Sequence, residues 1–236
     1  MKFAAEDAVY LAERKTLSRE LGQRELFSVI DHWPLYCGIS NLARFMAIAD
    51  LLRGTLAVPG HVAEFGSWRG ANLMFLAKLL RIYDPMGGKT VHCFDSFEGL
   101  TEFKAEDAAA TANRGRYAGS LPELQAMAAL YRLNDDIVIH QGLIEQTLPE
   151  VLKQDQALSF SFVYCDTDLY SSTRQILDGL HDRLSRGGVF VLDEWNHPSY
   201  PGETVAVREF VDAHPGQYEM EHVARTRQPS LVLRKR

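Results

Sequence analysis

From residue 61 onward, short apolar segments alternate with segments of helical periodicity. This alternation is typical of βαβ units, which build a parallel sheet with helices on both faces. We therefore predict an α/β fold, a Rossmann-like, doubly wound and mostly parallel seven-stranded sheet. Five of its strands are expected near His61–Phe65, Thr90–Phe94, Ile137–His140, Phe160–Cys165 and Val189–Leu192. The helices are expected roughly at Ala71–Ile82, Leu121–Tyr131, Glu145–Lys153, Ser172–Leu184 and Glu203–Ala213.

The two ends of the chain depart from this alternation. Near the C-terminus, Tyr218–Val223 and Leu231–Leu233 flank a polar turn, which predicts a hairpin whose last strand runs antiparallel. From about Arg19 to Gly54 the pattern is helical, with Ser40 or Asn41 as the expected N-cap residue of its last helix. We thus expect an N-terminal helical segment over residues 1–58 and a sheet domain over residues 59–236.

Composition narrows the partners and the compartment. The net charge of −6 offers no attraction for nucleic acid or an anionic membrane. No apolar run approaches the roughly 20 residues of a membrane span, and the first residues lack a signal peptide's apolar stretch. The 3 cysteines have no paired spacing. We expect a cytoplasmic protein and leave open whether it forms a homo-oligomer.

Acidic residues follow two neighbouring strands of the predicted sheet. Asp166 and Asp168 come directly after one strand, and Asp193 and Glu194 after the next. Because the carboxyl ends of parallel strands meet over one crevice, these side chains are expected to lie together. Such a cluster repels itself unless a cation neutralises it, and carboxylate oxygens suit Mg²⁺.

A glycine turn follows the first predicted strand. Gly66 and Gly70 lie between that strand and a helix, and Glu64 stands two residues before Gly66. Glycines permit a tight turn and the close approach of a ligand. The spacing departs from the G-x-G-x-x-G of pyrophosphate-binding turns. The acid favours a cationic, amino-acid-like group, and hence S-adenosylmethionine (SAM) over NAD.

The second and third strands extend this prediction to a nucleoside site. Asp95, followed by Ser96, stands at the tip of the second strand, where an acid typically accepts hydrogen bonds from both ribose hydroxyls. The alternative is that Asp95 only caps a turn. Gln141 and Gly142 end the third strand, where an adenine edge would lie.

Together these motifs resemble the macrocin O-methyltransferase (TylF/MycF) family. The resemblance spans about Val58 to Phe210, and its most specific part is the run Asp166-x-Asp168-Leu-Tyr-Ser-Ser-Thr. It implies a class I, SAM- and Mg²⁺-dependent enzyme that methylates sugar hydroxyls of natural products. It also implies Asp166, Asp193 and Glu194 as metal ligands. The family's Asp-Asp-Tyr is here Asp193-Glu194-Trp195.

The expected reaction is methyl transfer to one hydroxyl of a vicinal diol on a sugar or glycoside. A divalent ion bound by Asp166 lowers the pKa of such a hydroxyl and orients it. His197 is the candidate general base, the alternative being a solvated loop histidine. Asp168 is expected to cap the following helix, the alternative being that it orients a ligand. The long loop Thr101–Gly119 is expected to form a lid, the alternative being a flexible insertion.

Two other functions remain open from the sequence. Asp166-Thr167-Asp168 also matches the metal-binding D-x-D of glycosyltransferases, although such a fold does not need the glycine turn or Asp95. A non-catalytic SAM- or nucleotide-binding protein is the second alternative, and the intact acidic cluster argues against it.

Overall fold

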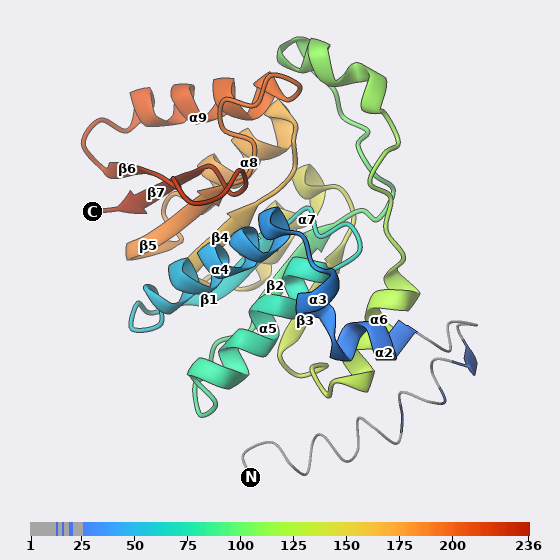
Figure 1. Ribbon diagram of the computed structural model, residues 1–236. Helices are drawn as coiled ribbons and strands as arrows, with labels where there is room; N and C mark the ends of the chain where they lie inside the picture. The colour runs from blue at the N-terminus through green and yellow to red at the C-terminus, as the bar shows by residue number, and fades with distance from the viewer. Residues whose placement is uncertain (1–12, 14–15, 17–18, 21–25) are drawn as a thin grey trace.

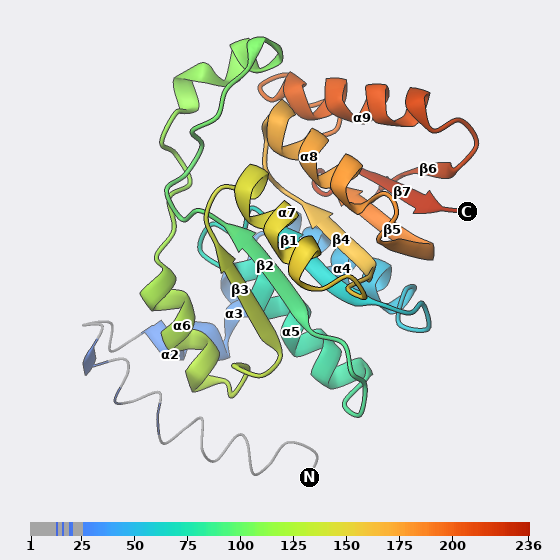
Figure 2. The ribbon, with the colours of Figure 1, turned by 180° about the vertical axis from the view of Figure 1, so that it is seen from behind.

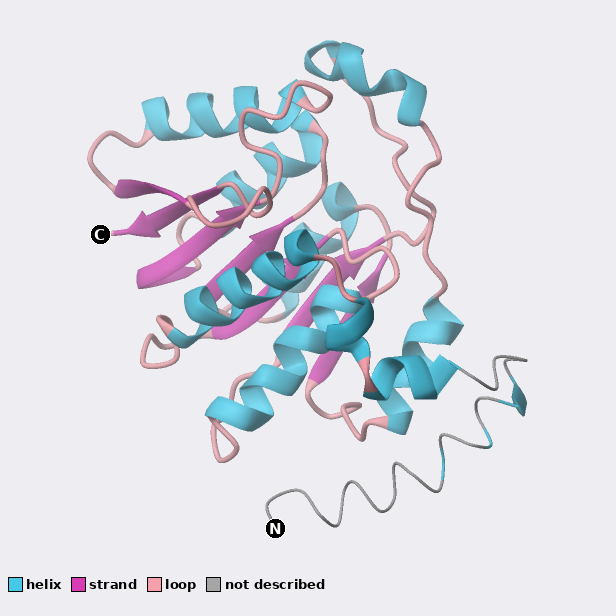
Figure 3. Cartoon of the chain, in the orientation of Figure 1, coloured by secondary structure: helices cyan, strands magenta, loops and turns pink. Residues whose placement is uncertain are grey.

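The computed structural model describes residues 13, 16, 19–20 and 26–236, and it shows one mixed sheet between helices (Figures 1 and 3). The strands are β1 His61–Phe65, β2 Val91–Asp95, β3 Ile137–Gln141, β4 Phe160–Cys165, β5 Leu184–Leu192, β6 Tyr218–His222 and β7 Leu231–Lys235. The helices are α2 Leu26–Asp31, α3 Trp33–Tyr36, α4 Ile39–Arg53, α5 Ala71–Tyr83, η1 Ala105–Asn113, α6 Leu121–Leu130, α7 Ile144–Gln154, α8 Tyr170–Leu180 and α9 Pro201–Ala213.

The strand order confirms the predicted doubly wound sheet. It is β3-β2-β1-β4-β5-β7-β6, and β1 to β5 are parallel. β7 runs antiparallel to both of its neighbours, as the predicted hairpin requires. The order reverses between β1 and β4, which lie side by side although about a hundred residues separate them. Such a switch point leaves a crevice at the carboxyl ends of the strands, where α/β proteins bind ligands.

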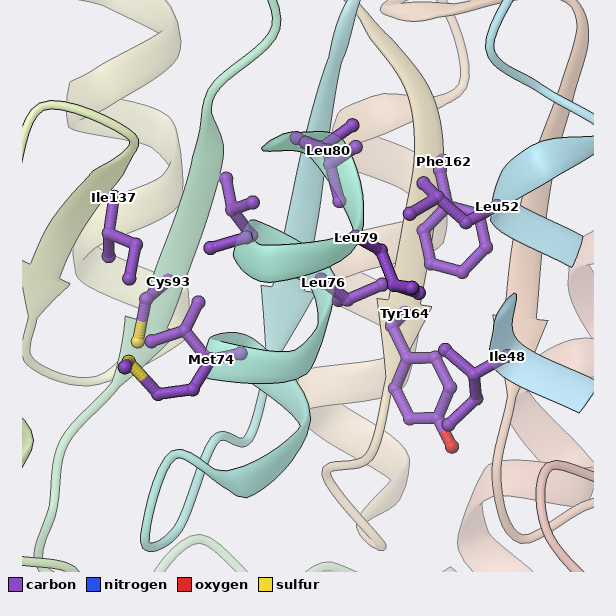
Figure 4. Close-up of a cluster of buried hydrophobic side chains, with 14 of the residues drawn as sticks. Ile48, Leu52, Met74, Leu76, Leu79, Leu80, Cys93, Ile137, Phe162 and Tyr164 are labelled. Carbon is purple, nitrogen blue, oxygen red and sulfur yellow. The ribbon is translucent and has the colours of Figure 1, made fainter. Parts of the chain in front are cut away.

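Two apolar layers hold the helices on the two faces of the sheet (Figures 1 and 2). On one face, Ile48 and Leu52 of α4 and Leu76 of α5 pack against Phe162 and Tyr164 of β4 (Figure 4). The other face is covered by α7, α8 and α9. Because Ile48 and Leu52 are 0% and 1% exposed, α4 is firmly seated on the sheet.

The boundaries of several elements differ from those predicted. The described N-terminal residues form α2, α3 and α4, and α4 begins after Gly38, so Ser40 and Asn41 lie inside the helix and the predicted N-cap is wrong. α8 ends at Leu180 because β5 already begins at Leu184. β5 begins at Leu184 and not at Val189 as predicted, because Gly187 and Gly188 interrupt the apolar pattern of its first half. The opening residues, judged to lack a signal peptide, lie outside the described part.

The long loop after β2 is anchored on the far side of the crevice. Its 3₁₀ helix, η1, lies against α9, and Asp107 is completely buried between them. The Asp107 carboxylate accepts hydrogen bonds from the backbone N–H groups of Lys104 and Tyr170, at 2.9 Å each. The loop therefore has a defined path, which Figure 2 shows leaving β2 and passing the end of α9. None of the helices in the described residues has the length and apolar character of a membrane span.

Candidate active site

A cavity of about 750 Å³ opens at the carboxyl ends of β1, β2, β4 and β5. Eight of the predicted site residues line it: Glu64, Gly66, Asp95, Ser96, Gly142, Asp166, Asp193 and Glu194. Gly70, Gln141 and His197 are not among the lining residues. The topology thus brings the glycine turn, the second strand tip and both acidic strand ends to one space.

The two glycines of the turn serve different purposes. A Cβ atom on Gly66 would lie 1.9 Å from the carbonyl oxygen of Asp166, so a side chain here would separate the turn from the end of β4. Gly70 has φ +79°, and its Cβ would meet the Leu124 side chain at 2.4 Å. Gly66 therefore permits the close approach of two strand ends, whereas Gly70 permits packing of α5 against α6.

Behind the turn lies a buried polar pocket. Glu64 is 1% exposed and accepts a 2.5 Å hydrogen bond from the Ser67 hydroxyl. Burial raises the pKa of the Glu64 carboxyl to about 8. Asn72, in the first turn of α5, lines the same cavity and is near enough to Glu64 to offset part of that rise in pKa, yet neither polar atom of its buried side chain makes a hydrogen bond of ordinary geometry. An unpaired buried amide is costly, so Asn72 fits a site that a polar ligand completes.

Asp95 ties the first two strand ends together. Its carboxylate accepts hydrogen bonds from the backbone N–H groups of Trp68, at 2.8 Å, and Phe97, at 2.6 Å. A carboxylate oxygen can accept more than one hydrogen bond, so these contacts do not exhaust its capacity. Asp95 therefore does cap a turn, as in the alternative above, and it also lines the cavity where the ribose contacts are predicted.

On the acidic side of the cavity, an arginine bridges two strand ends. The Arg44 guanidinium of α4 donates to Asp166 Oδ2 at 2.8 Å and to Asp193 Oδ2 at 3.1 Å. The second oxygen of Asp193 accepts a 2.5 Å hydrogen bond from the hydroxyl of Tyr164, in the middle of β4. Asp193 is 1% exposed, whereas the Asp166 side chain is 27% exposed. Asp166 is thus the more accessible of the two carboxylates.

Glu194 is held differently from the two aspartates. Its Oε1 accepts a hydrogen bond from the Gln228 side chain, and its backbone N–H donates to the buried Glu203 carboxylate at 2.8 Å. Its Oε2 is buried and has no hydrogen-bond partner. Burial, reinforced by Asp166, raises the pKa of the Glu194 carboxyl to about 7. Around Glu194, the cavity therefore has more acidic groups than neighbouring positive charges to balance them.

Asp168 does not cap the helix after β4, so that prediction is wrong. α8 begins at Tyr170 with Leu169 as its N-cap residue, and no side chain caps it. Asp168 has φ +61°, which turns its backbone into the left-handed region and removes it from the capping position. Its side chain lies at the cavity instead, where burial and the neighbouring Asp166 raise its pKa to about 9.

His197 stands beside the cavity and is engaged by charged neighbours. Its Nδ1 lies 3.5 Å from Glu194 Oε2, and its Nε2 lies 2.9 Å from Arg227 Nη2. Burial, followed by the Arg227 charge, lowers the pKa of His197. The ring is therefore neutral near pH 7, and its contact with a residue that lines the cavity is the one with Glu194.

The carboxylates of the cavity are suitable ligands for a divalent ion, but in the described residues they are not arranged around a common metal position. Within those residues, no three acidic, histidine or cysteine side chains are arranged to hold a metal ion together. Asp166 and Asp193 instead share Arg44. The unpartnered Oε2 of Glu194 and the three hard carboxylates are the donors that Mg²⁺ prefers. The set fits, provided that Arg44 moves.

Several residues of the site were not found from the sequence. These are Arg44, Asn72, Tyr164, Glu203 and Gln228. Asn72 did carry a signal, as the one amide in the apolar start of α5. The partners of Arg44 are 122 and 149 residues away, and no local pattern indicates such pairs.

The fold is that of class I methyltransferases. The sequence profile of the macrocin O-methyltransferase (TylF) family matches residues 36–227, and the chain belongs to this family. It is 33% identical over 145 residues to a tetracenomycin 4'-O-methyltransferase of Streptomyces olivaceus, covering 58% of this chain and 54% of that protein. It is 29% identical over 166 residues to mycinamicin III 3''-O-methyltransferase of Micromonospora griseorubida, covering 66% of this chain and 62% of the relative. The alignments thus span less than two thirds of these relatives.

Solved structures support the fold. CalS11, a calicheamicin methyltransferase, superposes with a TM-score of 0.79 at 23% identity, over 98% of this chain and 93% of that one. The O-methyltransferase NovP superposes with a TM-score of 0.70 at 24% identity, over 83% of this chain and 80% of NovP. The N-terminal helices as well as the sheet lie within the first of these superpositions.

Proposed function

We propose that this protein transfers a methyl group from SAM to a sugar hydroxyl of a glycosylated small molecule, with a divalent ion at the acceptor side. The observation that carries the proposal is one cavity that joins the Glu64–Asp95 side to the Asp166–Glu194 side. The family and the two named relatives, which methylate glycosylated compounds by name, support methyl transfer over the glycosyltransferase alternative.

Residues of the first two strand ends would hold SAM. Glu64 and Asn72 present a carboxylate and an unpaired amide, which suit the ammonium and carboxylate of an amino-acid tail. Asp95 would accept hydrogen bonds from the ribose, with Ser96 and Gly142 beside it. SAM supplies the methyl group on its sulfonium sulfur, and the reaction leaves S-adenosylhomocysteine (SAH) and a proton.

Residues of the other two strand ends would position the acceptor. Asp166 is the most accessible acid there, and burial raises the pKa of its carboxyl, so it accepts a proton or hydrogen bond more readily than an exposed aspartate. Asp193 and Glu194 would complete a divalent-ion site with Asp166. Such an ion, when bound, supplies Lewis-acid activation of the hydroxyl and fixes its orientation.

The N-terminal segment, residues 1–58, would form the acceptor side of the cavity. Asn41, Arg44 and Phe45 of α4 line the cavity. His197 would act through Glu194 rather than on the acceptor directly, because it contacts that carboxylate and not the cavity.

Methyl transfer from labelled SAM to a panel of deoxysugar glycosides, with and without EDTA, tests the proposal. We expect transfer to at least one glycoside, loss of transfer in EDTA and restoration by Mg²⁺. Calorimetry with SAH tests the cofactor separately. Failure to bind SAH would refute methyl transfer, whereas full activity in EDTA would refute only the divalent ion.

A further inference from the structure

Arg44 occupies the position at which the two acidic strand ends converge. Each of its two terminal nitrogens donates a hydrogen bond to one carboxylate oxygen, of Asp166 and of Asp193, and both aspartates line the cavity. We infer that Arg44 is a built-in counter-cation: it neutralises Asp166 and Asp193 while no divalent ion is bound, and it leaves them when such an ion binds. This inference rests on the divalent ion of the proposed function.

The charges around the cavity explain why a resident cation is needed. Asp166, Asp168, Asp193 and Glu194 all line one space, and Glu203 is buried directly behind Glu194. Within the described residues, Arg44 is the one basic side chain that pairs with both aspartates. Carboxylates crowded in a buried site destabilise one another unless a positive charge lies between them.

The hydrogen bonds show that arginine and a divalent ion compete for the same oxygens. Tyr164 donates to Asp193 Oδ1, so Oδ2 is the oxygen of Asp193 left for a cation, and Arg44 holds it at 3.1 Å. Mg²⁺ needs carboxylate oxygens at about 2.0–2.1 Å in an octahedral shell. A guanidinium at hydrogen-bond distance from the same two oxygens would lie against the ion, and like charges repel.

The motion required is that of a side chain rather than of a helix. α4 is anchored about one and about two turns further on by Ile48 and Leu52, which are 0% and 1% exposed. The Arg44 side chain itself is 23% exposed and lines the cavity. A long, partly exposed side chain can adopt another rotamer while its helix stays in place. Cation binding would therefore free Arg44 at the acceptor side of the cavity.

Manganese titration followed by electron paramagnetic resonance tests this competition without reference to activity. If the Arg44-paired state holds about nine tenths of the protein, it weakens apparent ion affinity about tenfold. Arg44→Gln should therefore bind Mn²⁺ about tenfold more tightly than the wild type or better. Arg44→Lys keeps the charge but cannot bridge both aspartates, so its affinity should fall between the two.

The matched control is Arg53→Gln in the same helix, which should leave Mn²⁺ affinity unchanged, since Arg53 is exposed and pairs with Asp50 on the surface. A second measurement needs no variant that might fail to fold: the hindered Nη signals of Arg44 in ¹⁵N-arginine NMR of the wild type should vanish when Mg²⁺ is added. In EDTA, Arg44→Gln should also have a lower melting temperature than the wild type. Adding Mn²⁺ should raise the melting temperature of Arg44→Gln by more than it raises that of the wild type.

The outcomes separate this inference from the proposed function. Equal Mn²⁺ affinity in the wild type and Arg44→Gln, with the NMR signals unchanged by Mg²⁺, would overturn the competition and leave a metal-dependent enzyme standing. If no variant binds Mn²⁺, the divalent ion and the competition both fail. SAH binding, measured on the same samples, shows whether the methyltransferase proposal survives either result.

Discussion

Single residues in this molecule carry several tasks at once, and Asp95 is the clearest case. Its carboxylate already holds the Trp68 and Phe97 backbone N–H groups, and it lines the cavity where the ribose is predicted. Asp95→Ala should weaken SAH binding about 10- to 100-fold, because a hydrogen bond to a charged group contributes roughly 1.5–3 kcal/mol. Calorimetry measures this, with the exposed Asp135→Ala as control. Unchanged affinity in a folded variant would contradict the ribose assignment.

Glu64 makes stability depend on pH. Burial raises the pKa of its carboxyl from 4.5 to about 8. Between these values the folded state holds a proton that the unfolded chain has lost, so the free energy of unfolding should fall as pH rises, by at most about 1.4 kcal/mol per pH unit. Urea denaturation of the ligand-free protein between about pH 5 and about pH 8 measures the slope.

The matched variant for this slope is Glu64→Gln, which removes the titrating group while keeping an acceptor for Ser67. Its slope should be flatter than that of the wild type over the same pH range, whereas the exposed Glu98→Gln should change nothing. SAM should bind more tightly as pH rises toward about 8, since a cationic ligand favours the ionised carboxylate. If the free energy of unfolding of Glu64→Gln fell with pH as steeply as that of the wild type, the pH dependence would come from the acids after β4 and β5 instead of Glu64.

Asp166→Ala separates the two halves of the site. Asp166 and Asp95 line the same cavity, but Asp166 ends β4 and shares Arg44 with Asp193, on the side where we propose that the acceptor binds. We expect at least a hundredfold loss of methyl transfer, on the order of 3 kcal/mol, with SAH affinity largely kept. Single-turnover assays and calorimetry on the same protein give both numbers. Near-normal transfer would remove Asp166 from the reaction.

At the level of whole elements, the sheet was predictable and the acceptor side was not. Short, mainly apolar segments bounded by turns identified β1 and β4 to the residue, because strands buried on both faces are predominantly apolar. The same reasoning missed half of β5, where glycines break the run. The Arg44 bridge joins segments more than a hundred residues apart and depends on how α4 crosses the sheet. Only the tertiary structure contains that information.

The loop element η1 depends on one buried carboxylate. Asp107→Ala would leave two backbone N–H groups without acceptors, which costs roughly 1–3 kcal/mol each when they are buried. We expect a lower melting temperature and faster proteolysis within residues 101–119, with SAH affinity unchanged. Glu106→Ala, one residue away, is the control. Equal proteolysis of the two variants would show that Asp107 does not anchor the loop.

At the scale of the whole molecule, α4 belongs to the N-terminal segment by sequence and to the main core by packing. Leu52 is 1% exposed in the cluster that includes Phe162 and Tyr164 (Figure 4). Arg44, on the same helix, pairs with the acids of the cavity. The predicted division into residues 1–58 and 59–236 therefore separates parts that share a core. Such parts unfold together when the contact between them is large and apolar.

Leu52→Ala tests this union. Removing a buried leucine side chain costs about 2–5 kcal/mol, through lost transfer free energy and the cavity left behind. The urea midpoint should fall while unfolding remains a single transition by fluorescence and circular dichroism. Met46→Ala is the control, since Met46 is 59% exposed on the same helix. If Leu52→Ala instead produced two transitions, α4 would unfold separately from the sheet. The helix that carries Arg44 would then be an independent folding unit.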